Sequence, residues 1–140
     1  MHPVIVQSAD IDSLRHVSNQ VYLRWVLEAA LAHSTALGFD EAAYVARGQA
    51  WVVRRHEIDY LAPALEGERL LVETRIATMA AASSVRRTQV LRAADRALLC
   101  RASTDWVYLD LARGRPARIP RDLRDRFPLE PDPDPPPPRE

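Results

Sequence analysis

Residues 8–38 read SADIDSLRHVSNQVYLRWVLEAALAHSTALG, a polar loop with two aspartates followed by a long apolar segment. Between residues 19 and 37 the only formal charges are Arg24 and Glu28, and with Gln20 they are spaced four residues apart. This spacing leaves one narrow polar stripe. A helix that is apolar around almost its whole circumference is buried by the rest of its domain. We therefore predict a central helix over residues 19–37, about 28 Å long.

The start of this helix carries the first functional indication. Asp10, Asp12 and His16 lie in the loop that precedes the helix, and Ser18 or Asn19 can cap it. The N-terminus of a helix presents unpaired N–H groups and the positive end of the helix dipole, which stabilise developing negative charge. The sequence therefore places acidic side chains beside a site suited to an anionic transition state.

Composition restricts the class of protein. A length of 140 residues suits one domain with its own core, and a formal net charge of zero gives no general attraction to nucleic acid or to an anionic membrane. The one cysteine, Cys100, rules out internal disulfides and fits a reducing compartment. The chain shows neither a signal peptide nor an uncharged apolar run of about 18 residues, so we expect a cytoplasmic location.

Extended segments surround the predicted helix. Residues 97–110 alternate most clearly, with Cys100 and Tyr108 on the same face. The segment 50–61 changes parity between its ends, which predicts a bulge or a bend near residues 54–57. We expect further strands over residues 3–8, 69–79 and 84–93, a loop with one helical turn over 39–49, and a short terminal helix over 119–127.

The order of these segments predicts an α+β fold. One strand and one long helix precede four strands joined as hairpins, so we expect a five-stranded antiparallel sheet, its last four strands in a meander, wrapped around the central helix. Several outward strand positions are small or apolar, which favours an oligomer. The domain is expected to cover residues 1–127. Residues 128–140, PLEPDPDPPPPRE, offer little apolar surface and are predicted to form a disordered tail.

Short motifs extend along most of the chain. They are Asp10-Ile11-Asp12, His16-Val17, Asn19, Tyr22, Glu28, IDYLAPA at 58–64 with Gly67, LLVET at 70–74, RGRP at 113–116 and Ile119-Pro120. In this order they resemble the hot-dog fold acyl-CoA thioesterases of the 4-hydroxybenzoyl-CoA thioesterase type. Arg15 stands where that family usually has a glycine, and Ser18 where it usually has its first asparagine. Because arginine adopts a positive φ less readily than glycine, we expect the loop around Arg15 to differ in shape.

The resemblance assigns the chemistry to the loop and to the start of the helix. It implies that Asp12 acts as a general base or as a nucleophile on the thioester carbon, while the backbone N–H of Asn19 polarises the carbonyl oxygen. His16 is a candidate general acid. Glu28 is a rival carboxylate, because another branch of hot-dog thioesterases has its catalytic acid on the central helix. The alternative for Glu28 is an ion pair with Arg24, four residues earlier.

The resemblance also implies contacts with the substrate. Tyr22 lies in the first turn of the helix, and Ser84 matches a serine that helps to line the site in relatives. Arg86 and Arg87 are the first candidates for a basic patch that binds the anionic coenzyme A, and Arg54-Arg55 the second; solvated strand faces would explain them as well. Coenzyme A belongs to the substrate, so we expect no separate cofactor and no metal. Active sites in this family lie between subunits, which implies a homodimer or homotetramer.

Three functions stay open. The first is hydrolysis of an acyl-CoA or acyl-carrier-protein thioester to free acid and thiol. The second is a non-catalytic module that binds acyl thioesters, an alternative that Arg15 keeps open. An enoyl-thioester hydratase fits less well, because those enzymes have an aspartate and a histidine five residues apart in a run that contains proline. Asp12 and His16 are four residues apart without a proline.

Overall fold

The computed structural model describes residues 1–131. The helices are η1 (a 3-10 helix, Ser8–Asp10), α1 (Asn19–Ala36), α2 (Glu41–Ala46) and α3 (Arg121–Arg126). The strands are β1 (His2–Ile5), β2 (Gln49–Tyr60), β3 (Arg69–Met79), β4 (Ser83–Arg92), β5 (Leu98–Asp110) and β6 (Arg115–Pro116). Strands β2 to β5 and helix α1 begin and end within one residue of the predicted positions. Strand β1 ends three residues earlier than predicted, shortly before η1 begins.

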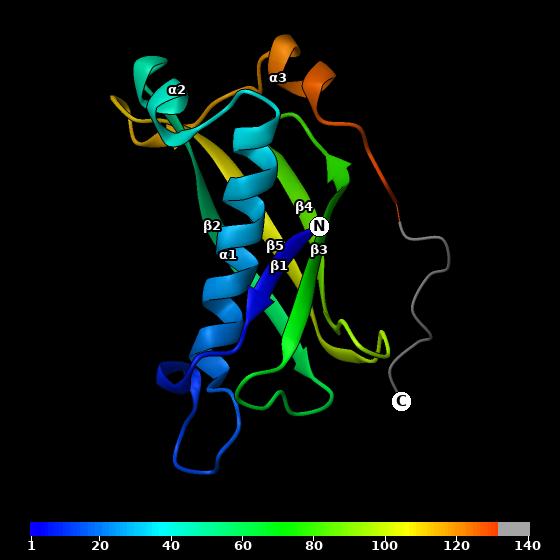
Figure 1. The fold of residues 1–140 in the computed structure, drawn as a ribbon. Coiled ribbons are helices and arrows are strands. Elements are labelled where there is room, and N and C mark those ends of the chain that lie inside the picture. Colours follow the sequence, from blue (N-terminus) through cyan, green and yellow to red (C-terminus); the bar gives the residue numbers. More distant parts are fainter. Residues whose placement is uncertain (132–140) are drawn as a thin grey trace, which may run out of the picture.

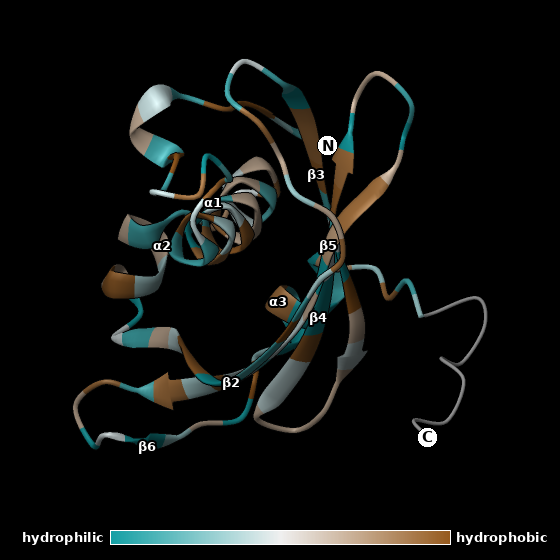
Figure 2. Ribbon diagram, turned by 90° about the horizontal axis from the view of Figure 1, so that it is seen from below, coloured by the Kyte–Doolittle hydropathy of each residue, from teal (hydrophilic) through white to brown (hydrophobic). Residues whose placement is uncertain are grey.

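The strands form one antiparallel sheet that curls around α1 (Figure 1). Their order is β1-β3-β4-β5-β2, and the two-residue β6 pairs with β5 outside this path. Seen along the helix, the sheet encloses α1 on one side, with α2 lying beside the helix (Figure 2). Five main strands around one central helix confirm the predicted α+β hot-dog fold.

The position of β2 differs from the predicted meander. β2 pairs with β5, from Gln49↔Asp110 to Tyr60↔Cys100, and not with β3. Pro63 and Gly67 do mark a change of direction, but residues 61–68 carry the chain from one part of the sheet to another and do not close a hairpin. The predicted bulge is confirmed, since the β2–β5 register shifts between Val53 and Arg55.

Two apolar clusters fill the space between the helices and the sheet. The first surrounds the N-terminal half of α1, where Trp25 is 2% exposed and shares a cluster with Leu99 and Cys100. The second joins α3 to the sheet and includes Leu123 and Phe127. The first cluster fixes the N-terminal half of α1, and with it the start of the helix, against the sheet.

Helix α2 is the helical turn that was predicted within residues 39–49, and it is slightly longer than one turn. Asp40 is its N-cap, and the Asp40 side chain accepts a hydrogen bond from the Ala43 N–H at 2.8 Å. Such a cap satisfies one of the unpaired N–H groups at a helix start. Tyr44 is buried and anchors α2 over the sheet.

The C-terminal segment stays in contact with the sheet beyond residue 127, the predicted end of the domain. Leu129 forms a parallel bridge with Ile76, and the Glu130 N–H donates to the Ile76 carbonyl oxygen at 2.8 Å. The predicted tail therefore begins with residues that pair with β3. The rest of that prediction, residues 132–140, lies outside the described part of the chain.

Candidate active site

The loop that precedes α1 is closed at its base by the backbone. Ile11 and Val17 form an antiparallel bridge, and the Asp12 N–H donates to the His16 carbonyl oxygen at 2.9 Å. The Val17 N–H donates to the Ala64 carbonyl oxygen at 3.1 Å, which ties the loop to the segment after β2. Arg15 has a φ of 63°. The arginine therefore adopts the left-handed conformation that glycine takes more readily.

Asp12 presents a carboxylate with one oxygen held and one free. Its Oδ1 accepts hydrogen bonds from the backbone N–H of Leu14 at 2.9 Å and of His16 at 3.3 Å. Its Oδ2 has no hydrogen-bond partner among residues 1–131, and the side chain is exposed. The two backbone donors orient the carboxylate, while the second oxygen remains available to a substrate or a water molecule.

Helix α1 begins directly after this loop. Ser18 is the N-cap, but its side chain makes no capping hydrogen bond, and Asn19 is the first helical residue. The backbone N–H of Asn19 has no acceptor in the described part of the chain, as is usual for the first residues of a helix. Unpaired N–H groups and the helix dipole thus lie a few residues from Asp12 along the chain.

Asp10 is buried and holds the start of α1 in place. It is 4% exposed, and its two oxygens accept from the Gln7 N–H at 2.9 Å and from Arg24 Nη2 at 2.8 Å. The Ser18 N–H donates to the Asp10 carbonyl oxygen at 3.0 Å. Asp10 therefore links η1 to α1 and is not open to a substrate.

Glu28 and His16 have few contacts that would suit catalysis. Glu28 makes the predicted ion pair, 3.4 Å from its Oε1 to Arg24 Nε, and its Oε2 lies 3.9 Å from His2 Nε2. The His16 side chain is exposed and has no hydrogen-bond partner among the described residues, whereas its backbone holds Asp12.

Tyr22 lies in the core and not on a surface that a substrate could reach. It is 3% exposed, its hydroxyl oxygen accepts the Ala64 N–H at 3.2 Å, and its ring meets Trp25 edge-on. Burial raises the pKa of this hydroxyl. The prediction of a substrate contact is corrected accordingly, since Tyr22 positions the segment that also binds the loop through Ala64.

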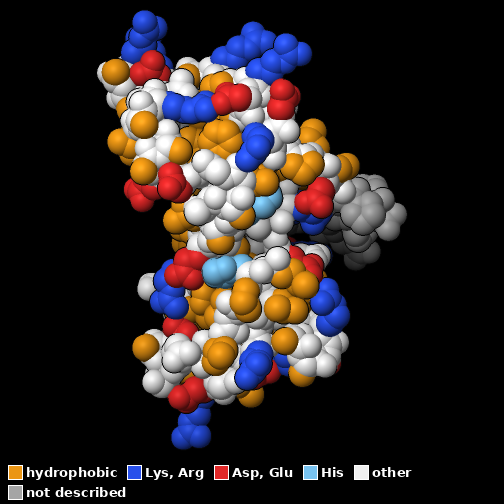
Figure 3. All heavy atoms as spheres, turned by 45° about the horizontal axis from the view of Figure 1, so that its top comes forward, with side chains coloured by type: hydrophobic (Ala, Val, Ile, Leu, Met, Phe, Trp, Pro, Cys, Tyr) orange, Lys and Arg blue, Asp and Glu red, His pale blue; other side chains and the backbone are white. Residues whose placement is uncertain are grey.

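Arg86 and Arg87 do not form one basic patch. Neighbouring residues of a strand point to opposite faces of the sheet, a rule that the prediction overlooked. Arg86 points inward and is 6% exposed, whereas Arg87 donates a hydrogen bond to Ser103 Oγ. On the face of the molecule that Figure 3 shows, basic side chains are spread out and interspersed with acidic ones.

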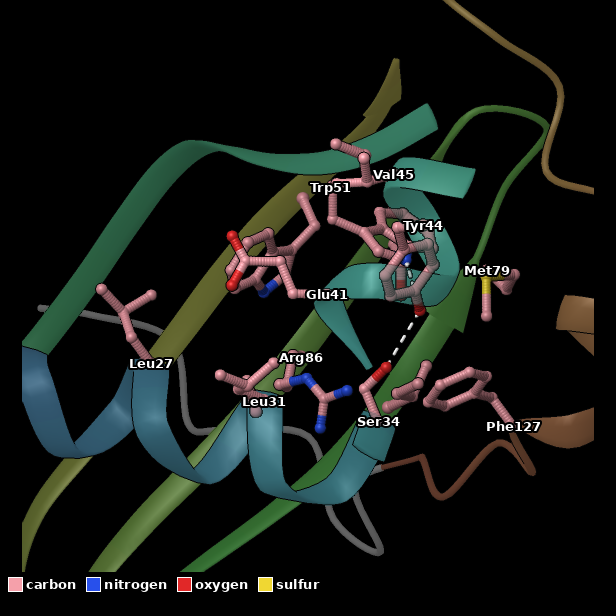
Figure 4. A pocket seen from close by; sticks show the side chains of 15 residues that line it. Leu27, Leu31, Ser34, Glu41, Tyr44, Val45, Trp51, Met79, Arg86 and Phe127 are labelled. Carbon is pink, nitrogen blue, oxygen red and sulfur yellow. Dashed lines mark hydrogen bonds between the residues drawn. The ribbon is translucent and has the colours of Figure 1, made fainter. Parts of the chain in front are cut away.

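Ser84 and Arg86 line a cavity of about 380 Å³ between the C-terminal half of α1, α2 and the sheet (Figure 4). Its walls are mostly apolar. Leu27 and Leu31 line it from α1, on the side of the helix that faces away from the first core cluster. Asp12 does not line this cavity. The apolar outer side of the helix was visible in the sequence, but the cavity depends on how α2 packs over the sheet, which the predicted helical turn at 39–49 did not indicate.

Residues 1–131 show neither a membrane span nor a cluster of metal ligands. No helix there is both long and apolar enough to cross a membrane, and no three His, Cys, Asp or Glu side chains come together where a metal could bind. Cys100 is buried, and burial raises its thiol pKa to about 12. The thiol therefore stays protonated and packs as an apolar group.

A curled sheet around one helix, with an acidic loop at the start of that helix, defines the class of hot-dog thioesterases. The model of the thioesterase-like superfamily matches residues 6–127, and the chain belongs to that superfamily. The predictions of a hot-dog acyl-CoA thioesterase and of a thioester hydrolase are confirmed at this level.

Solved structures agree with this assignment. A 1,4-dihydroxy-2-naphthoyl-CoA thioesterase from Synechocystis superposes with a TM-score of 0.83 at 25% identity, over 89% of this chain and 92% of that one. A thioesterase from Thermus thermophilus, solved with coenzyme A and Zn, gives 0.77 at 28% identity, over 90% and 89%. A gentisyl-coenzyme A thioesterase gives 0.81 at 18% identity, over 91% and 98%, which supports the shared fold alone.

Proposed function

We propose that this chain hydrolyses acyl-CoA thioesters, or the corresponding acyl-carrier-protein thioesters, to a free acid and a thiol. The observation that carries the proposal is the pairing of an oriented carboxylate, Asp12 with its free Oδ2, and the unpaired N–H groups at the start of α1. Hydrolysis needs both a base or nucleophile and donors for the oxyanion. The substrate of the Synechocystis relative and the coenzyme A bound to the Thermus relative support the same substrate class.

In the proposed reaction, the Asn19 N–H and the Asp12 carboxylate each have one role. The thioester carbonyl oxygen accepts a hydrogen bond from the Asn19 N–H, so that negative charge develops at the positive end of the helix dipole. Asp12 Oδ2 either takes a proton from the attacking water or attacks the carbonyl carbon itself, giving a mixed anhydride that water then cleaves. In both cases the C–S bond breaks, the thiolate leaves and takes up a proton, and Asp12 is regenerated as the carboxylate.

The active site is completed, in this proposal, by a second subunit. Asp12 is exposed and does not line the cavity of about 380 Å³, whereas a closed site that excludes water favours chemistry on a thioester. Strand β2 lies at the edge of the sheet with unpaired backbone groups, and Val52 and Tyr60 on it are 39% and 46% exposed. Pairing of two β2 strands would form a homodimer, and two dimers a homotetramer.

Binding of coenzyme A then requires basic groups other than Arg86. Arg54 and Arg55 are exposed at the bulge of β2, and a guanidinium group binds phosphate well. We infer that they are the first candidates for this contact. The single free Cys100 thiol fits the proposed cytoplasmic location.

The proposal is tested by the release of free thiol from a panel of acyl-CoAs with short, long and aromatic acyl groups. We expect turnover of at least one member of the panel, detected with a thiol reagent. The non-catalytic alternative predicts binding of acyl-CoA without thiol release for every member. That result would contradict the proposal.

A further inference from the structure

Arg86 is a buried cation without an anionic partner among residues 1–131. It lies on β4 with 6% of its surface exposed, and no carboxylate of residues 1–131 is within ion-pair distance of its guanidinium group. Glu41 lines the same cavity but makes no ion pair with Arg86. Burial lowers the pKa of Arg86 to about 10, so the group stays charged at neutral pH. Buried charges in proteins are normally paired.

The hydrogen bonds of Arg86 leave one edge of the guanidinium group open. Its Nη1 donates to His33 Nδ1 at 2.9 Å and to Thr74 Oγ1 at 3.0 Å, two neutral acceptors that fix the position of the side chain. Its Nε and Nη2 have no acceptor among the described residues. These two atoms form the fork that binds both oxygens of a carboxylate. In Figure 4 the guanidinium group lies in the cavity on the side of Leu31 and Ser34.

A second hydrogen-bond donor belongs to the same cavity. Trp106 lines it, and Trp106 Nε1 is the one buried side-chain nitrogen or oxygen without a hydrogen-bond partner in the described part of the chain. Ser84 pairs with Trp106 and Arg86 with Thr104 in the β4–β5 ladder, so Arg86 and Trp106 are diagonal neighbours on adjacent strands. Arg86 and Trp106 thus both offer unused hydrogen-bond donors to the cavity, and the charge of Arg86 favours a ligand with an anionic group.

The remaining walls of the cavity favour a ligand whose larger part is apolar. Ile76, Met79 and Phe127 line the cavity beside Trp51. A volume of about 380 Å³ is within the range of small-molecule sites and suits one compact ring system. A small inorganic anion would leave these apolar walls without contacts.

We propose that this cavity is a binding site for a compact apolar molecule with one carboxylate, which the Nε and Nη2 groups of Arg86 hold by two parallel hydrogen bonds. The ligand is a free acid, because Arg86 bonds to His33 near the end of α1, about 20 Å along the helix from its start beside Asp12. The binding itself stands on the cavity and does not require the proposed hydrolysis.

The test is calorimetric titration of the full chain with 2-naphthoate and with 2-naphthamide, which has the same ring but no charge. We expect the acid to bind about 10- to 100-fold more tightly than the amide, the range for hydrogen bonds to a charged group. Arg86→Gln should remove this preference and leave the amide affinity unchanged, whereas the same change at the exposed Arg101 should have no effect. Equal affinities of the wild type for acid and amide would overturn the proposal, even if Arg86→Gln fails to fold.

Thioesters test whether this site is separate from the site of hydrolysis. Arg86→Gln should change kcat/KM by the same factor for 4-carboxybenzoyl-CoA, which has a distal carboxylate, and for benzoyl-CoA, while 2-naphthoate binding is lost. A selective loss of about 10- to 100-fold for 4-carboxybenzoyl-CoA would overturn the assignment to a free acid. A chain that binds 2-naphthoate but hydrolyses no thioester would refute the proposed function and leave this site intact.

Discussion

Arg15 holds a backbone conformation that suits glycine better. Its φ of 63° places it in the left-handed region, where a side chain costs about 1–2 kcal/mol. The bridge between Ile11 and Val17 and the hydrogen bonds of Asp12 hold the loop in this shape. Arg15 thus adopts the left-handed backbone conformation that glycine takes more readily.

Arg15→Gly should stabilise the fold. The removal of strain exceeds the extra entropy that glycine gains in the unfolded chain, so we expect the free energy of unfolding to rise by about 0.5–1 kcal/mol. Urea unfolding followed by circular dichroism measures this change. Ser13→Gly, in the same loop but without a positive φ, is the control and should be neutral or destabilising. Equal destabilisation by the two changes would show that the conformation at Arg15 carries no strain.

The positions of the loop residues could be predicted better than those of the strand residues. Asp12 could be placed next to the helix start because the two are adjacent in the chain. The setting of Arg86 could not be found in this way, because its burial depends on the docking of α1 and on Thr74 from a neighbouring strand. A buried arginine also contradicts the usual position of that residue type at the surface.

At the level of elements, the alternation of apolar and polar residues predicted well where the strands begin and end. It predicted less well which strands pair. The parity change within β2 located the bulge between Val53 and Arg55. The pairing of β2 with β5 was missed because turn residues such as Pro63 and Gly67 indicate that the chain turns, without indicating which strand becomes the neighbour. Long-range pairing is settled by the burial of α1 against the sheet, which a local pattern does not contain.

The contact between α1 and β4 should make stability depend on pH. Burial and the neighbouring Arg86 lower the pKa of His33 below its ordinary value of 6.5, while the charge of Glu130 acts in the opposite direction. The unfolded chain therefore takes up a proton at a higher pH than the folded chain. The contribution of His33 to stability is complete above about pH 6.5 and is lost as the pH falls toward the pKa of the folded state.

Urea unfolding at about pH 7.5 and about pH 5.5 tests this dependence. We expect the wild type to be less stable at the lower pH. His33→Gln keeps an acceptor for Arg86 but cannot be protonated, so it should show a smaller loss. Burial also lowers the pKa of His56, so His56 adds a pH dependence that the wild type and His33→Gln share. An unchanged pH dependence in His33→Gln would contradict the assignment.

At the scale of the whole molecule, the proposed active site requires more than one subunit. Sedimentation velocity should give a dimer or tetramer, and Val52→Lys on the edge strand β2 should shift the protein toward the monomer with loss of thioesterase activity, because a charge on an edge opposes strand pairing. Leu129→Lys, at a residue that is also exposed, is the control and should leave the assembly intact. An active monomer would show that no partner is needed.

The central claim is that the Asp12 carboxylate performs the reaction at the start of α1. Asp12→Asn is the most direct test, because the asparagine Oδ1 can still accept the N–H groups of Leu14 and His16 and so preserve the loop. We predict that kcat for a good acyl-CoA substrate falls about 10²- to 10⁴-fold with the unfolding midpoint unchanged, whereas Glu28→Gln keeps its turnover. Near wild-type turnover in Asp12→Asn, together with an inactive Glu28→Gln, would move the catalytic acid to the helix and contradict the account.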